Sequence, residues 1–259
     1  QDVREGWHAD LESTSTVPGA QLVYFSTRQE MDTQALRRSR ILISEAALQV
    51  ADPQDTQLHY VVESAETRSR VVISNHHDEP VSVNFQLNLQ EQRARDTSRS
   101  LPAKGQISLT LAELFGDNLE GIGSLQINSE LALVANVLLE TDTTRNETII
   151  TGSPGGVALE EMTTGAFSGL KWGGGYSTDI VLLNPHDESI TGELSFFDPD
   201  GEAVEITGAD SPSVAYQIAP GGHFLLRQSA SSIWPKQVYA VVESDDPMPS
   251  GGGILSLRN

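Results

Sequence analysis

The sequence repeats itself, and this repeat limits what the chain can fold into. Residues 6–26 resemble residues 238–258, and a weaker third copy covers residues 124–140. Within the copies, Leu11-Glu12-Ser13 aligns with Val242-Glu243-Ser244 and with Ile127-Asn128-Ser129, so that the serines stand 116 and 115 residues apart. We call this motif the repeat tail. A repeat of this length predicts tandem domains of one fold.

The part of the repeat upstream of the tail, the repeat head, occurs only twice. Residues 69–75 align with residues 178–184 at an offset of 109, and His77-Asp78-Glu79 aligns with His186-Asp187-Glu188. A chain of 259 residues has room for two domains of about 100 to 130 residues. We therefore predict an orphan tail of two strands over residues 1–26, a first β-sandwich over 27–140, and a second over 141–259.

Short apolar or alternating segments, separated by turn residues, predict an all-β fold of antiparallel sandwiches. Turns such as Asp198-Pro199-Asp200-Gly201 place proline where its fixed φ suits the second turn position. The predicted strands are Trp7–Glu12, Gln21–Ser26, Arg40–Ser44, His59–Glu63, Arg70–Ser74, Val81–Leu89, Gln106–Leu111, Ser124–Asn128, Val134–Leu139, Thr148–Thr151, Ser177–Leu183, Thr191–Phe197, Ala203–Ile206, Val214–Ile218, His223–Arg227, Gln237–Glu243 and Gly253–Leu257.

Helices are expected to be few and short. Ser44–Val50 and Leu111–Phe115 each have room for one or two helical turns, and Thr110 with Glu113 resembles a capping box before the second. Met31–Arg38 is polar and predicts a loop. The segments between each tail and the next head, residues 27–57 and 141–166, contain short apolar runs, so we expect them to add a strand and to let the two domains share strands.

Composition excludes several classes of function. The formal charge of −20 opposes nucleic-acid phosphates and anionic membrane surfaces. The chain has no cysteine, which excludes disulfides and thiolate metal sites. Its longest apolar stretch, around Leu131–Leu139, is too short to span a bilayer. Because the chain begins at Gln1, it is a fragment, an expression product or a mature secreted form, and we expect the secreted form, outside the cell or on its surface.

A family resemblance rests mainly on the second head. The runs 173–185 and 191–201, together with Tyr216–Leu226 and the tail, resemble repeated β-sandwich domains in large secreted proteins of environmental bacteria. The resemblance is good over 166–259, weaker over 58–139, and limited to a tail over 5–26. It implies an immunoglobulin-like seven-stranded domain that serves as an extracellular spacer or assembly unit, and it carries over no catalytic residues.

Candidate ligand sites are weak in this sequence. Each His-Asp-Glu triplet consists of consecutive residues behind an asparagine, which favours a solvated turn over a metal site. Asp198 and Asp200 resemble part of a calcium loop but lack its later acidic ligands, so a hairpin turn is the simpler interpretation. We expect no cofactor, with calcium as the one ion to consider.

Three aromatic residues, Trp172, Tyr176 and Trp234, form a candidate glycan-stacking platform, with core packing as the alternative. No catalytic motif is present: there is no Gly-x-Ser-x-Gly elbow, no His-Glu-x-x-His and no phosphate-binding glycine loop. We therefore predict that the protein is not an enzyme.

The orphan tail gives the leading hypothesis on function. Two strands alone cannot bury an apolar face, so they need a partner sheet in the same chain or in another copy. We expect a structural protein whose copies join head to tail into a filament, fibre or surface assembly by strand exchange or edge pairing. The alternatives are a glycan-binding adhesin module and a monomeric spacer in which the tail completes residues 27–139. The residues expected in the joint are Trp7, Ala9, Leu11, Val23 and Phe25.

Overall fold

The computed structural model describes residues 21–32, 37–49, 53–144, 148–158, 162–206, 211–229, 232–245 and 247–257, the first two ranges by backbone alone. The all-β prediction is confirmed: the described chain consists of antiparallel strands with one short helix, α1 (Leu111–Phe115). Contacts divide the chain into unit 1 (Gln1–Thr56 and Val61–Ser153) and unit 2 (Gln57–Tyr60 and Pro154–Asn259).

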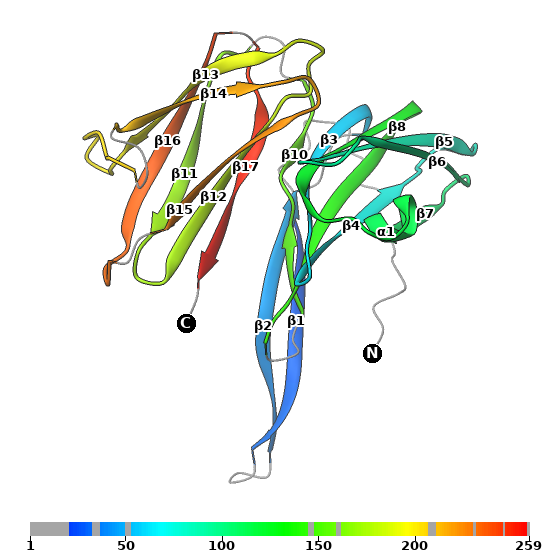
Figure 1. Ribbon diagram of the computed structural model, residues 1–259. Coiled ribbons are helices and arrows are strands. Elements are labelled where there is room, and N and C mark those ends of the chain that lie inside the picture. The colour runs from blue at the N-terminus through cyan, green and yellow to red at the C-terminus, as the bar shows by residue number, and fades with distance from the viewer. Residues whose placement is uncertain are drawn as a thin grey trace, which may run out of the picture. The chain divides into compact units, whose positions relative to one another are not determined.

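Unit 2 contains two sheets of four and three strands, labelled in Figure 1. The first has the order β11-β16-β13-β14 and the second the order β15-β12-β17. Alternate residues of these strands point into a shared core that includes Trp172, Phe196 and Tyr216. The strands are β10 (Gly155–Gly156), β11 (Thr164–Trp172), β12 (Tyr176–Leu183), β13 (Ile190–Phe197), β14 (Ser213–Ile218), β15 (His223–Ser229), β16 (Lys236–Ser244) and β17 (Ser250–Leu257).

Unit 1 repeats this plan, except that the 22-residue strand β8 takes the places of both β16 and β17. Residues 123–129 of β8 pair with β5, and residues 134–141 pair with β4, so this strand belongs to both sheets. β6 pairs with β5, β7 with β4, and β9 with the end of β8. The strands are β3 (Gln54–Glu63), β4 (Thr67–Ser74), β5 (Val81–Leu89), β6 (Arg95–Leu101), β7 (Gln106–Thr110), β8 (Gly121–Asp142) and β9 (Thr148–Gly152).

Strict alternation explains why β5 is a core strand. Its apolar residues occupy every second position and are buried, while serine, asparagine and glutamine occupy the positions between them. At the end of β7 the backbone turns into α1, because the Thr110 side chain accepts the Glu113 N–H and the Glu113 carboxylate accepts the Thr110 N–H. The helix then adds Leu111 and Leu114 to the core.

A buried hydroxyl makes equivalent contacts between β3 and β4 in unit 1 and between β11 and β12 in unit 2. In unit 1 the Ser69 Oγ donates to the Val62 carbonyl at 2.9 Å and accepts the Val62 N–H at 2.9 Å. In unit 2 the Thr178 Oγ1 donates to the Lys171 carbonyl at 2.7 Å and accepts the Lys171 N–H at 3.2 Å. Ser69 and Thr178 are also equivalent in the sequence repeat, which shows that the repeat heads fold alike.

Upstream of unit 1's sheets, β1 (Gln21–Asp32) and β2 (Arg37–Gln49) form an antiparallel ladder with a register shift after Ser26. β2 lies beside β9. Because Ser44–Gln49 belongs to β2, the helical turns expected there are not formed. The loop predicted over Met31–Arg38 is also too long, since β1 continues to Asp32 and β2 begins at Arg37.

The structure also shows how Ala203–Ile206 and β3 are arranged. Ala203–Ile206 is not a strand and contributes only a single bridge between Phe197 and Ala203. In β3, contacts assign residues 57–60 to unit 2, and Leu58 and His59 pair with β10. Among the described residues, no helix has the length and apolar character needed to cross a membrane.

Candidate functional site

The predicted joint falls largely at the edge of what the structure describes. Trp7, Ala9 and Leu11 lie outside the described residues. Val23 and Phe25 lie in β1, where their backbones pair with Ala47 and Glu45 of β2. This pairing resembles that of the β8–β9 hairpin, in which Leu139 and Thr141 pair with Thr151 and Ile149. The described hairpin is thus a repeat tail strand with the strand that follows it.

The turns that carry the His-Asp-Glu triplets are built around a buried asparagine. In unit 2 the Asn184 Nδ2 donates to the carbonyls of Glu188 (2.7 Å) and Ile218 (2.9 Å), and its Oδ1 accepts the His186 N–H (3.0 Å). The His186 Nε2 also lies 3.4 Å from the Met248 carbonyl. The Asn184 side chain is completely buried. This network therefore ties three chain connections together at one end of the unit.

Unit 1 contains the same network. The Asn75 Nδ2 donates to the carbonyls of Glu79 (2.8 Å) and Pro102 (3.0 Å), and its Oδ1 accepts the His77 N–H (2.9 Å). The His77 Nε2 donates to the Ala132 carbonyl at 2.8 Å. The triplet is thus a turn in both units, and its histidine holds the backbone. The role of the preceding asparagine was missed from the sequence, although its recurrence at an offset of 109 was the available signal.

The glycan-platform residues do not form one surface. The Trp172 ring is 2% exposed and packs edge to face against Phe196, with ring centres 6.1 Å apart, which excludes it from stacking on a sugar. Tyr176 is half-buried, and the Lys171 Nζ lies 5.5 Å from its ring centre. Trp234 is 75% exposed. Of these three residues, only Trp234 is largely exposed to solvent.

The calcium candidates belong to a turn. One carboxylate oxygen of Asp198 accepts the N–H groups of Asp200 and Glu202, both at 2.9 Å. Gly201 closes the turn with a φ of 86°, a conformation that glycine adopts without strain. In the described part of the chain, no three His, Asp or Glu side chains gather as a metal site would need.

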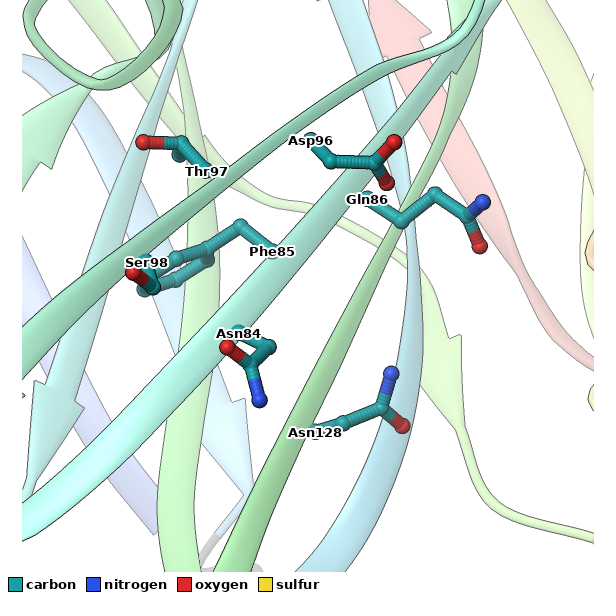
Figure 2. Close-up of a pocket in the computed structure, with 7 residues that line it drawn as sticks. All are labelled: Asn84, Phe85, Gln86, Asp96, Thr97, Ser98 and Asn128. Carbon is teal, nitrogen blue, oxygen red and sulfur yellow. The ribbon is translucent and has the colours of Figure 1, made fainter.

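The outer face of unit 1 has a shallow hollow of about 450 Å³, which the sequence did not point to. Figure 2 shows Gln86, Asp96 and Asn128 directed away from the side to which the core residue Phe85 points. Cross-strand pairing aligns Asn84 with Ser98 and Asn128, and Gln86 with Asp96. These groups donate and accept hydrogen bonds, but the hollow contains a single carboxylate and no partner for acid–base work.

Several buried ionisable groups have pKa values moved by their surroundings, among them His59 and Glu140. Burial lowers the pKa of His59 to about 4. Burial opposes ionisation of Glu140, but hydrogen bonds from Arg70 (2.6 Å) and Arg68 (2.7 Å) outweigh it and hold the pKa of this carboxyl below its usual value. Both groups serve the packing of strands, since His59 lies under β10 and Glu140 joins β8 to β4.

The arrangement as a whole offers sheet edges and backbone pairing, with no described constellation suited to catalysis. Comparison with protein-family models and with curated proteins finds no match to this chain.

Proposed function

We propose that this chain is an extracellular structural protein whose copies join head to tail through added β-strands. The observation that carries the proposal is the β1–β2 hairpin. It has the sequence and pairing of a repeat tail with its following strand, yet among the described residues each of its strands is laddered only to the other. Open strand edges are templates for another chain.

The completeness of both units supports a partner in another copy. Among the described strands, β3 to β8 give seven in unit 1 when the two halves of β8 are counted separately, and β9 adds an eighth; β11 to β17 give seven in unit 2. β1 and β2 belong to unit 1 by their contacts, and β2 lies beside β9, but neither strand is laddered to another described strand of the unit. The arrangement in which the tail completes the first sandwich of its own chain therefore has less support than addition to a second copy.

The strand pairings bear on the immunoglobulin-like prediction in two ways. Counting the seven strands of unit 2 from β11, the second pairs with the fifth and the third with the sixth, as in immunoglobulin domains. However, the first pairs with the sixth and the seventh with the second, so the two terminal strands have exchanged sheets. We propose an immunoglobulin-like spacer and assembly domain with exchanged terminal strands, secreted and without catalytic role.

Removal of the hairpin tests the function. A variant lacking residues 1–49 is expected to stay monomeric in light scattering and to show no filaments by electron microscopy, with the circular dichroism of folded sheets. A control variant with the sequence of residues 21–32 shuffled keeps the composition and charge and should also fail to assemble. Filaments from the deletion variant at the wild-type concentration would refute the proposal.

Glycan binding is the second candidate, and the exposed Trp234 favours it. Trp234→Ala is expected to abolish retention on polysaccharide while leaving self-assembly unchanged. Tyr176→Ala serves as the comparison, because this half-buried ring is partly covered by Lys171. Equal retention of wild type and Trp234→Ala would exclude this candidate.

A further inference from the structure

The last strand of unit 2 has one edge to which no described strand is laddered, although β10 lies near its first residues. β17 pairs with β12 along its whole length, and no other described strand is laddered to it. Its second half carries two exposed leucines, Leu255 (49% exposed) and Leu257 (51%). Exposed apolar residues on an unpaired edge mark an interaction site.

The equivalent strand of unit 1 shows what covers such an edge. Leu139 of β8 lies opposite Ser69, and Leu255 of β17 lies opposite Thr178. Since Ser69 and Thr178 make the same hydroxyl contacts, Leu139 and Leu255 are equivalent. Leu139 is only 6% exposed, and here β9 runs along the second edge of β8. A strand of the β9 type is thus what β17 lacks.

β2 is a strand of this type. In the repeat tail, Val23 stands ten residues after Ser13, as Leu139 stands ten residues after Ser129. Val23 pairs with Ala47 of β2 as Leu139 pairs with Thr151 of β9. Ala47 is therefore the equivalent of Thr151. β2 has β1 on one edge. β9 of the same chain lies beside β2, but no described strand is laddered to its other edge.

Charge also favours this match. Residues 21–49 contain four arginines and three acidic residues, whereas residues 154–259 contain fourteen acidic and four basic residues. A hairpin with a small positive charge would approach a unit with a net charge of −10, although two whole chains of −20 repel each other.

We propose that the β17 edge of one copy receives β2 of a second copy, in the register that β9 takes on β8, so that Leu255 lies opposite Ala47 of the second copy. This inference rests on the proposed function, since it names the acceptor of the joint. Leu255 and Leu257 then become buried as Leu139 is in unit 1.

The absence of cysteine from the chain allows a direct test of register. Leu255→Cys and Ala47→Cys are made as separate full-length variants and mixed under mild oxidation, so that their disulfide can form only between copies. A cross-linked dimer of the two variants is expected on a non-reducing gel. Ser39→Cys, at the other end of β2, replaces Ala47→Cys as the control and should give no cross-link with Leu255→Cys.

A second measurement uses charge at the edge. Leu255→Asp with Leu257→Asp is expected to raise the concentration needed for assembly about tenfold or more, because two apolar side chains can no longer be buried. Met162→Asp, at an equally exposed residue of unit 2 (48%), should leave it unchanged. If the wild type assembles but the cross-link between Leu255→Cys and Ala47→Cys does not form, β17 is not the acceptor strand. The same conclusion follows if the double substitution leaves assembly unchanged, and neither outcome refutes the proposed function. Failure of the wild type to assemble overturns the proposed function as well.

Discussion

Two completely buried asparagines, Asn75 and Asn184, hold equivalent turns in the two units. Each amide group donates to two backbone carbonyls and accepts one backbone N–H, so a single buried side chain satisfies three backbone groups of the turn and of the neighbouring connection. The triplets behind them attract attention in the sequence because they contain chemically reactive residues. The residue that stabilises each turn is the asparagine that precedes the triplet.

Asn184→Ala should therefore destabilise unit 2. Two carbonyls and one N–H would lose their partner, and the contact with the Ile218 carbonyl is buried, which predicts a loss of about 2 to 3 kcal/mol in the free energy of unfolding. Urea denaturation followed by circular dichroism measures it. Asp187→Ala, at an exposed position of the same turn, should change the free energy by less than about 0.5 kcal/mol. Equal effects of the two substitutions would contradict the assigned role of the amide.

His59 predicts a pH dependence of stability. Burial lowers its pKa to about 4 from an ordinary value of 6.5, so the unfolded chain binds a proton at this residue more readily than the folded chain. The contribution of neutral His59 to the free energy of unfolding is fully present above pH 6.5. It decreases as the pH falls toward 4, by about 3 kcal/mol in all.

The difference between wild type and His59→Leu isolates this contribution from those of the carboxyl groups. Denaturation of both proteins at several pH values should show their difference in stability shifting in favour of His59→Leu as the pH falls from 6.5 to 4. A difference that does not change with pH would show that His59 is exposed to water in solution.

At the scale of elements, the sequence predicts strands well where side chains alternate and poorly where they do not. Val81–Leu89 was predicted with the bounds of β5, since every second residue is apolar. β6 (Arg95–Leu101) was missed because it is polar, with only its last residue buried. β11 was missed because its glycines and polar residues hide the alternation. Ser124–Asn128 and Val134–Leu139 were predicted as two strands, whereas β8 runs through both.

The helix α1 was predicted from its cap, and the cap can be tested. Thr110→Ala removes the side chain that accepts the Glu113 N–H, which should cost about 1 kcal/mol in the free energy of unfolding. Thr110→Ser keeps the hydroxyl and should lose much less. If both substitutions cost the same, the methyl group of Thr110 stabilises the protein and the hydrogen bond does not.

At the scale of the whole molecule, counting repeat tails predicted a surplus strand pair but not its structure. The Gln21–Ser26 strand was expected, and β1 contains it, but β1 continues to Asp32 and pairs with β2. The reason is that pairing is decided by the neighbour strand and the turn between them, and residues 27–49 alternate too weakly to show either. The open edge of β17 was equally hidden, because its leucines resemble those of a buried strand.

Each unit has its own apolar core, and this predicts separable unfolding. Phe85 in unit 1 and Phe196 in unit 2 are at most 1% exposed, so replacing either with alanine should cost about 3 to 5 kcal/mol. Of the three tryptophans, Trp172 and Trp234 lie in unit 2 and Trp7 in the orphan tail, so the buried Trp172 reports on unit 2.

Phe196→Ala should therefore lower the denaturation midpoint measured by tryptophan fluorescence. Phe85→Ala should leave this fluorescence midpoint unchanged and should instead lower the denaturant concentration at which the unit 1 amides lose their protection from hydrogen exchange. β3 opposes this independence, because its residues 57–60 belong to unit 2 and its ends to unit 1. If both substitutions shift both probes equally, β3 couples the two cores into a single cooperative unit, and a joint between copies would then transmit strain through the whole subunit.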